Sequence, residues 1–193
     1  MSKKILGFDV SSSCIGYCVL EVDGDKVKFI SCNYLKPIKT GNIIERIVDT
    51  RNKIKKIIEE IKPDYIGIED IISFMQGKST AQTIITLTTF NRMICLLAYD
   101  YLGRMPDLFN VMSIRHGLKI NNIFPKKEDM PELVAKHLEI TFPYERSTKG
   151  KNKGGIKVES YDMADGVAVA LYLAFTLTNK IKRKVKNEFK RSL

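Results

Sequence analysis

Apolar and polar residues alternate along the first part of the chain in the way typical of β-strands. A short apolar run covers residues 4–9, and two alternating segments follow at 15–22 and 26–34, joined by a loop that contains Gly24. Tight turns of this kind connect antiparallel strands. The pattern therefore predicts a three-stranded antiparallel meander at the start of the chain.

The spacing then changes to that of helices. Between residues 42 and 62 isoleucine and valine recur every three or four positions, and Pro63 closes the segment. Residues 65–69 form a short apolar strand, which lies parallel to the first strand if the helix is a crossover. Further elements are predicted at 79–102 (helix), 108–112 (short strand), 128–139 (helix) and 161–177 (helix). The order β-β-β-α-β-α-β-α-α predicts an α/β domain with a mixed five-stranded sheet.

The composition indicates one globular domain with two basic segments. A chain of 193 residues, 44% of them hydrophobic, can bury a substantial core. The formal charge of +10 is concentrated in residues 146–157 and 180–193, so we expect a domain at 1–179 followed by a basic tail at 180–193. Such segments suit a polyanionic partner, although basic runs also serve solubility.

Cysteine usage and the start of the chain give expectations about location. The four cysteines lack the paired CxxC spacing and nearby histidines of zinc sites, so we expect reduced, partly buried thiols. No signal-peptide pattern follows Met1, and no apolar run approaches the length of a membrane span. We expect a soluble intracellular, cytoplasmic protein with no membrane association.

Four acids carry the candidate chemistry. Asp9 and Glu69 each end an apolar strand, where open α/β sheets bind their ligands, and Asp162 and Asp165 lie on one face of the last helix. Converging carboxylates repel one another unless cations such as Mg²⁺ or Mn²⁺ join them. Two such ions can catalyse phosphodiester hydrolysis. Acids also favour the first turn of a helix for electrostatic reasons alone, and Asp9 could be a turn residue.

Three segments in the same order resemble a known family. They are Ile5-Leu6-Gly7-Phe8-Asp9-Val10-Ser11-Ser12-Ser13 through Ile15-Gly16-Tyr17, then Ile66-Gly67-Ile68-Glu69, then Tyr161-Asp162-Met163-Ala164-Asp165-Gly166-Val167-Ala168-Val169-Ala170. Together they resemble the RuvC-type Holliday junction resolvases of the ribonuclease H-like superfamily over roughly residues 4–178. The resemblance implies a ribonuclease H-like mixed five-stranded sheet flanked by helices.

The resemblance also implies an activity and a set of site residues. Asp9, Glu69, Asp162 and Asp165 match the family's catalytic, metal-binding acids, which hold two Mg²⁺ ions, for which Mn²⁺ substitutes. Family members are homodimers that nick two strands of a four-way DNA junction symmetrically. The helix at 79–102 corresponds to their dimer interface; the alternative is an ordinary core helix with no partner. No nucleotide cofactor is implied.

Basic residues are the predicted DNA contacts. The resemblance implies Arg115, Lys119, Lys126 and Lys127, and the basic loop adds Lys149, Lys151 and Lys153. The family's junction-opening aromatic has no clear match, because Ile72 stands at its spacing and Phe74 is the nearest ring. The basic loop and tail look more like those of the divergent enzymes carried by bacteriophages.

Other functions remain open at this point. The segment Gly7 to Ser13 followed by Gly16 also looks like the first phosphate loop of actin-like and sugar-kinase-like phosphotransferases, but 193 residues leave no room for their second half. A related nuclease could act on RNA–DNA hybrids, flaps or forks. A catalytically silent nucleic-acid-binding module is a third alternative, against which the four acids argue.

Overall fold

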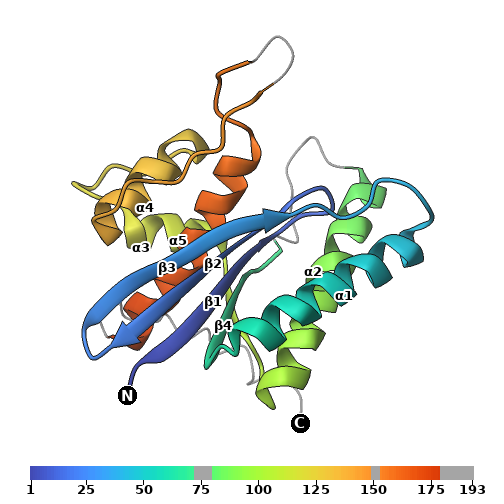
Figure 1. Cartoon of the computed structure of the whole chain (residues 1–193), viewed down its shortest axis with the longest axis horizontal. Coiled ribbons are helices and arrows are strands. Elements are labelled where there is room, and N and C mark those ends of the chain that lie inside the picture. The colour runs from blue at the N-terminus through green and yellow to red at the C-terminus, as the bar shows by residue number, and fades with distance from the viewer. Residues whose placement is uncertain (72–79, 149–152, 179–193) are drawn as a thin grey trace.

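The sheet is mixed and five-stranded, with helices on both faces (Figure 1). The computed structural model describes residues 1–71, 80–148 and 153–178. The strands are β1 (Lys3–Val10), β2 (Ile15–Asp23), β3 (Lys26–Leu35), β4 (Tyr65–Glu69) and β5 (Asp107–Phe109). Their spatial order is β3-β2-β1-β4-β5; β1, β2 and β3 are antiparallel, and β4 and β5 run parallel to β1. The predicted meander, crossover and ribonuclease H-like sheet are confirmed.

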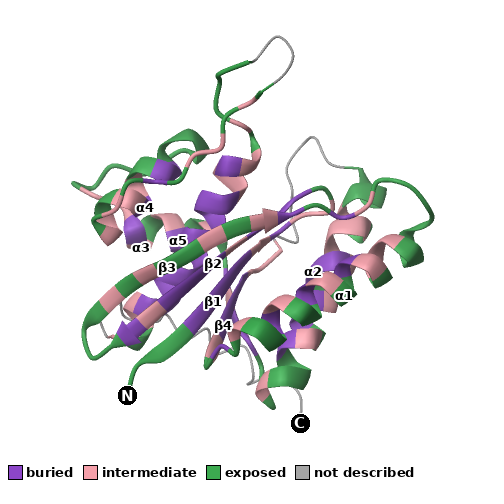
Figure 2. Ribbon diagram, viewed as in Figure 1, coloured by how far each residue is buried: buried purple, intermediate pink, exposed green. Residues whose placement is uncertain are grey.

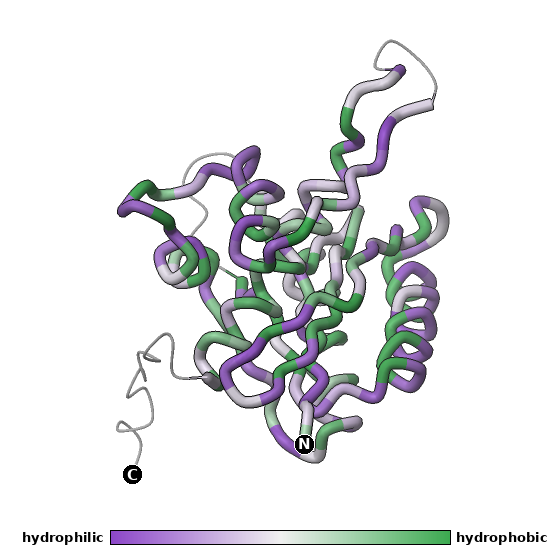
Figure 3. Tube along the Cα trace, turned by 60° about the vertical axis from the view of Figure 1, so that its left-hand side comes forward, coloured by the Kyte–Doolittle hydropathy of each residue, from purple (hydrophilic) through white to green (hydrophobic). Residues whose placement is uncertain are grey.

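The helices form two groups. They are α1 (Ile43–Ile61), α2 (Ala81–Leu102), α3 (Val111–Leu118), α4 (Met130–Leu138) and α5 (Glu159–Leu177), with a 3₁₀ turn η1 (Lys127–Asp129) before α4. One face of the sheet is covered by α1 and α2, and the other by α5, which has α3 and α4 beside it (Figure 1). Figure 3 shows how hydrophilic and hydrophobic residues alternate along these helices.

One predicted boundary is wrong. The strand expected at 108–112 ends at Phe109, and a helix that the pattern did not predict, α3, begins at Val111. Asn110 is the reason, because its side chain accepts a hydrogen bond from the backbone N–H of Met112 (2.8 Å) and caps the helix. Ile114 and Leu118, four apart, are the buried residues of α3.

The α1 and α2 face is an aliphatic and aromatic core. Leu6 and Phe8 point from β1 toward Ile54 of α1 and Phe90 of α2, and all four are fully buried. Figure 2 shows the central strands as the most buried part of the sheet. The other core contains Ile5 and most of α5, which is buried from Met163 to Ala174. Strand alternation therefore sends even-numbered β1 residues to one face and odd-numbered ones to the other.

Glycine lets α5 approach the sheet closely. A Cβ atom on Gly16 would lie 1.8 Å from the carbonyl oxygen of Asp162, and one on Gly166 would lie 2.7 Å from the carbonyl carbon of Gly16. Along the same helix, a Cβ on Gly7 would lie 2.4 Å from the backbone nitrogen of Ala170. Only residues without a side chain permit these contacts. The start of α5 is thereby held against β1 and β2.

The basic loop is built as a hairpin where the structure describes it. Arg146 pairs with Ile156 in an antiparallel bridge, and both described flanks project from the body of the molecule (Figures 1 and 3). Glu145 fixes its base by accepting hydrogen bonds from Lys157 (2.7 Å) and from the hydroxyl of Tyr34 on β3 (3.0 Å). The predicted basic tail at 180–193 lies outside the described residues.

Two further expectations can be compared with the structure. All four cysteines are free thiols, and only Cys32 is not fully buried. Within the described ranges, no helix combines the length and the apolar character needed to cross a membrane.

Candidate metal centre

The parallel strands β1 and β4 place two acids side by side. Phe8 is in register with Ile68, so the next residues, Asp9 and Glu69, stand at the same level at the carboxyl ends of neighbouring strands. Gly7 and Gly67, two positions earlier, both face α5. Because side chains alternate along a strand, Asp9 and Glu69 also point toward α5.

The close packing of α5 brings in the other two acids. Gly16 is the direct partner of Asp9 in the β1–β2 ladder, and it touches the backbone of Asp162. Carboxylate oxygens of Asp9, Asp162 and Asp165 all lie within 4.8 Å of one another. Three of the four predicted acids are therefore one cluster, and Glu69 is close enough to interact with it electrostatically.

Burial and mutual repulsion make these acids hard to ionise. Burial raises the pKa of Asp9 well above its ordinary value, and the charges of Glu69 and Asp165 raise it further. Burial likewise raises the pKa of Glu69 to about 7, with a further rise from Asp165 and opposition from Arg115 and Lys127. The pKa of Asp165 rises to about 6 through burial, against the effect of Lys127 and Arg115. The charges of Lys127 and Arg115 therefore only partly offset the repulsion between the carboxylates of the site.

Lys127 is the main internal cation of the cluster. Its Nζ lies 2.8 Å from Oδ1 of Asp162 and 3.5 Å from Oδ2 of Asp165. Burial works against its charge, but the hydrogen bond to Asp162 and the charges of both acids raise its pKa. The predicted DNA contact Lys127 is therefore an ion-pair partner of the acids in this structure.

The residues present fit a divalent cation. The donors are carboxylate oxygens, which Mg²⁺ and Mn²⁺ prefer, and three of them are within the span of one coordination sphere. The raised pKa values of Asp9, Glu69 and Asp165 reflect a repulsion that a cation would remove. A cation at Asp162 and Asp165 would have to replace or share the position of the Lys127 ammonium group.

The other predicted DNA contacts differ in their relation to the acids. Arg115 of α3 acts on Glu69 and Asp165 through its charge, and its Nε is buried without a hydrogen-bond partner among the described residues. Lys119 ends α3, with its Nζ 3.5 Å from Nε2 of His116, and Lys126 is exposed. Lys153 is exposed on the hairpin, whereas Lys149 and Lys151 lie outside the described residues.

Asn91 is a site residue that the sequence did not reveal. It is 1% exposed on α2, and its Nδ2 donates a hydrogen bond to the backbone carbonyl of Glu69 (2.8 Å). Its Oδ1 accepts one from Arg92 (3.3 Å), which also pairs with Asp70 (3.0 Å). An amide among the buried positions of α2 was the only available signal. Asp70 points to the α2 side, opposite to Glu69.

A further acid of the chain has another partner. Glu159, which begins α5, forms an ion pair with Lys36. Ile72 and Phe74, considered for the junction-opening position, lie outside the described residues.

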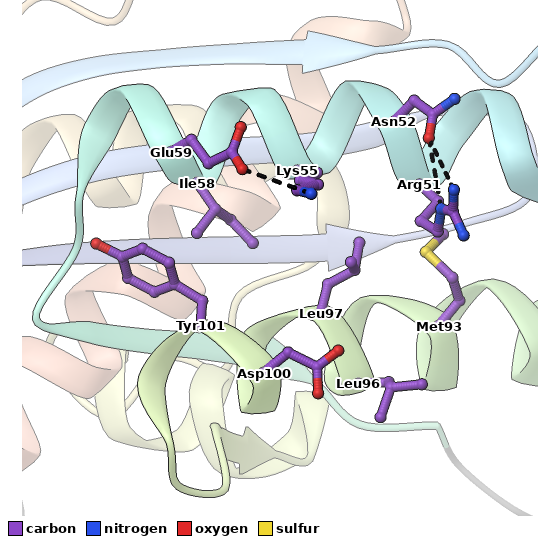
Figure 4. Close-up of a pocket in the computed structure, with 10 residues that line it drawn as sticks. All are labelled: Arg51, Asn52, Lys55, Ile58, Glu59, Met93, Leu96, Leu97, Asp100 and Tyr101. Carbon is purple, nitrogen blue, oxygen red and sulfur yellow. Dashed lines mark hydrogen bonds and ion pairs between the residues drawn. The ribbon is translucent and has the colours of Figure 1, made fainter.

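A surface groove lies away from the acids, between α1 and α2. It has a volume of about 580 Å³. Figure 4 shows its lining, in which apolar side chains such as Leu96 and Leu97 lie among charged ones such as Asp100 and the Lys55–Glu59 pair. Among the residues that the structure describes, neither the four predicted acids nor a cluster of metal-binding groups takes part in it.

Comparison with known proteins decides the family. Residues 5–107 match the family model of the crossover junction endodeoxyribonuclease RuvC. The chain belongs to the RuvC family. A RuvC from Aliarcobacter butzleri is 24% identical over 168 residues, which cover 87% of this chain and 96% of the relative. A RuvC from Sulfurovum is 32% identical over 100 residues, 52% of this chain and 60% of the relative.

Solved RuvC structures show the same fold. RuvC from T. thermophilus, solved in complex with a Holliday junction substrate, matches with a TM-score of 0.66 and 14% identity, covering 91% of this chain and 94% of that one. The yeast mitochondrial Holliday junction resolvase matches with a TM-score of 0.63 and 17% identity, covering 92% and 80%. At these identities the structural likeness establishes that this chain has a ribonuclease H-like fold.

Proposed function

We propose that this RuvC-family chain is a metal-dependent endonuclease that resolves four-way DNA junctions. The observation that carries the proposal is the convergence of Asp9, Asp162 and Asp165, whose carboxylate oxygens lie within 4.8 Å of one another although Asp9 precedes the other two by more than 150 residues in the chain. The match of residues 5–107 to crossover junction endodeoxyribonucleases supports the choice of substrate.

Asp9, Glu69, Asp162 and Asp165 are the proposed catalytic and metal-binding residues. When bound there, a pair of Mg²⁺ ions would activate a water molecule and stabilise the leaving 3′ oxygen of a phosphodiester. The chain itself supplies the rigid support for the donors: Asp9 and Glu69 stand on adjacent parallel strands, and the contact with Gly16 fixes Asp162. Asn91 holds the backbone of Glu69.

Basic residues around the acids would bind the DNA backbone. Arg115 lies beside Glu69 and Asp165, where its guanidinium group could bind a phosphate through bidentate hydrogen bonds. Lys119, Lys126 and Lys153 would add phosphate contacts, and Lys127 could turn from Asp162 to a phosphate once a metal is bound. Lys149 and Lys151 are included on sequence grounds alone.

A homodimer is the proposed assembly, with α2 at its interface. Ile85, Leu96 and Tyr99 fall on one stripe of α2 and are 59%, 61% and 46% exposed. Leu96 also lines the groove between α1 and α2, so the apolar surface continues there. Two copies meeting along this stripe would present two metal centres to one junction, as symmetric nicking requires.

The neighbours Glu69 and Asp70 provide a matched test. Glu69→Gln should reduce the cutting of a synthetic four-way junction with Mg²⁺ by roughly 1,000-fold, because it removes a donor worth several kcal/mol of transition-state stabilisation. Asp70→Asn, one residue away but on the opposite side of β4, should cut at nearly the wild-type rate. Junction binding by both variants, measured by fluorescence anisotropy, should stay within a few-fold of wild type.

The substrate panel decides between this function and its alternatives. Duplex, flap, fork and RNA–DNA hybrid substrates should be cut far more slowly than the junction. Preferential cutting of hybrids or flaps would assign the chain to a different nuclease activity. Binding without any metal-dependent cutting would make it a DNA-binding module.

A further inference from the structure

The flanks of the basic hairpin, residues 145–148 and 153–158, form a two-stranded ladder that projects from the body of the protein (Figure 1). Ser147 donates its N–H to the carbonyl of Gly155 and accepts a hydrogen bond from the N–H of Gly154, both at 2.8 Å. A two-stranded ladder on its own is only marginally stable in water. The direction of the hairpin therefore depends on contacts at its base.

Glu145 makes these contacts. Its Oε2 accepts hydrogen bonds from Nζ of Lys157 on the opposite flank (2.7 Å) and from the hydroxyl of Tyr34 on β3 (3.0 Å). Its backbone N–H donates to Oγ of Ser160 in α5 (3.0 Å), which is fully buried. The hydrogen bond from Lys157 lowers the pKa of Glu145, so the carboxylate is charged at neutral pH. One acid thus joins the hairpin to the sheet and to the last helix.

The same region of α5 carries part of the metal centre. Ser160 lies in the first turn of α5, two residues before Asp162. Glu159, beside it, forms an ion pair with Lys36, which directly follows β3. The hairpin is therefore fixed in direction relative to the turn of helix that leads to Asp162.

The hairpin flanks also carry unpaired positive charge. Arg146 and Lys153 are exposed, and neither forms an ion pair with a described residue. The guanidinium group of Arg146 donates one hydrogen bond to the carbonyl of Gly154 (2.8 Å), which leaves most of its donors available. Four residues of strand, from Lys157 to Lys153, span at most about 13 Å, the length of roughly four base-pair steps of duplex DNA. Cations at this spacing suit the phosphates of a duplex.

We propose that Glu145 is a positioning residue that directs the hairpin flanks along a double-stranded arm of the substrate, where Arg146 and Lys153 bind phosphates. The inference rests on the proposed function, since it takes branched DNA as the ligand. Charge alone predicts the opposite effect of Glu145, because an acid among cations weakens the attraction of a protein for a polyanion. Glu145 instead favours binding, since it determines where the two cations lie.

The sign of one substitution tests this role. In the Asp9→Asn background, which keeps the DNA uncut, Glu145→Gln should weaken binding to a four-way junction although it makes the protein more positive. We expect a loss of roughly 10-fold, the effect of losing one charged hydrogen bond. The slope of log K against log salt should become shallower by about 1.8, or about 0.9 for each of two lost phosphate contacts. Fluorescence anisotropy over a salt series measures both quantities.

A double-mutant cycle shows whether Glu145 acts through the two cations. In protein that carries Arg146→Gln and Lys153→Gln, the addition of Glu145→Gln should no longer weaken binding, because the contacts that it directs are already absent. Tyr34→Phe removes one of the two hydrogen bonds to the carboxylate without a change of charge. It should weaken junction binding by roughly 2- to 5-fold.

A matched control removes a different acid. Glu128 is exposed next to Lys127 and forms no ion pair with the residues that the structure describes. Glu128→Gln should bind the junction as tightly as the parent protein or slightly more tightly, as charge alone predicts. Equal or tighter binding by Glu145→Gln would overturn the positioning role. So would a loss that persists in full when both cations are absent, since Glu145 would then act elsewhere.

The outcomes separate this role from the nuclease assignment. If the protein with Asp9 intact cuts four-way junctions, and Glu145→Gln binds them as tightly as its parent, only the positioning role is wrong. If the protein with Asp9 intact neither binds nor cuts them, the proposed function fails, and the positioning role fails with it.

Discussion

The two faces of the sheet are packed by different means. On the α1 and α2 side, branched and aromatic side chains such as Phe8, Ile54 and Phe90 fill the space between helix and sheet. At the acid end of the α5 side, Gly16 and Gly166 let backbone meet backbone. A side-chain core can adjust when one residue changes size, whereas a backbone contact has no flexible atoms to move. The candidate metal centre lies on the face that is less able to adjust.

The largest effect is expected from a substitution at Gly16, which would disrupt the backbone packing on the α5 side. Gly16→Ala places a methyl group 1.8 Å from the carbonyl oxygen of Asp162, so α5 must shift away from β2. Overpacking of this kind costs about 1–3 kcal/mol, and displacement of a catalytic group by about 1 Å costs on the order of 100-fold in rate. Chemical denaturation and the junction-cutting assay should show both losses together.

The control for Gly16 lies on the opposite face. Ile54→Val removes one methylene from the α1 core and should cost about 0.5–1.5 kcal/mol with no loss of cutting. If Gly16→Ala kept the wild-type rate, the close contact would not be what positions Asp162. A similar loss of cutting in Ile54→Val would mean that stability alone controls the rate.

A smaller effect is expected from substitution of Lys127, which offsets the negative charges of Asp162 and Asp165 on α5. Lys127→Met removes the ammonium group that competes with a metal for Asp162 and Asp165. We expect Mn²⁺ to bind roughly 10-fold more tightly by isothermal titration calorimetry, since an ion-paired hydrogen bond need no longer be broken. The metal-free protein should melt at a lower temperature than wild type.

Its neighbour Lys126 serves as the reference. It is exposed and forms no ion pair with the described residues, so Lys126→Met should leave Mn²⁺ affinity unchanged. Weaker metal binding by Lys127→Met would show that the lysine assists the metal instead of competing with it.

The smallest effect is a dependence of stability on pH. Folding raises the pKa of Glu69 from 4.5 to about 7 and that of Asp165 from 3.8 to about 6, so the folded state holds protons that the unfolded state has released. Stability of the metal-free protein should therefore fall as pH rises from about 4 to about 7. Thermal melts in a chelating buffer should show this, and saturating Mg²⁺ should reduce the slope.

One variant tests whether the acids on the α5 face cause this pH dependence. Glu69→Gln removes a carboxyl group that ionises over this range and should flatten the dependence of stability on pH. Asp70→Asn, on the α2 side, should leave that dependence unchanged. Stability that rises over this pH range would show that the acids are compensated more fully than their surroundings indicate.

Local sequence patterns predicted most of the elements. The alternation in residues 15–34 and the helical spacing in 42–62 matched β2, β3 and α1, because each depends on which side of one element faces the core. The error at 108–112 arose where Asn110 acts as a helix cap directly after a three-residue strand. The apolar pair Val111 and Met112 after the strand is compatible with a longer strand and with a new helix. The cap formed by Asn110 decides between the two.

The sequence by itself determined which residues could do chemistry. An acid at the end of each of two apolar strands, and two more three apart on a helix, are visible in the chain because strand and helix periodicity are local properties. Their order along the chain, with the glycines between them, also carried the resemblance to the RuvC-type resolvases.

Only the tertiary structure decided how these residues meet. The contact of Gly16 with Asp162, the bond from Asn91 to the carbonyl of Glu69 and the position of Lys127 between two aspartates join residues from different elements. Such contacts depend on how closely helices approach the sheet, which is set by packing across the whole domain. No local pattern contains that distance.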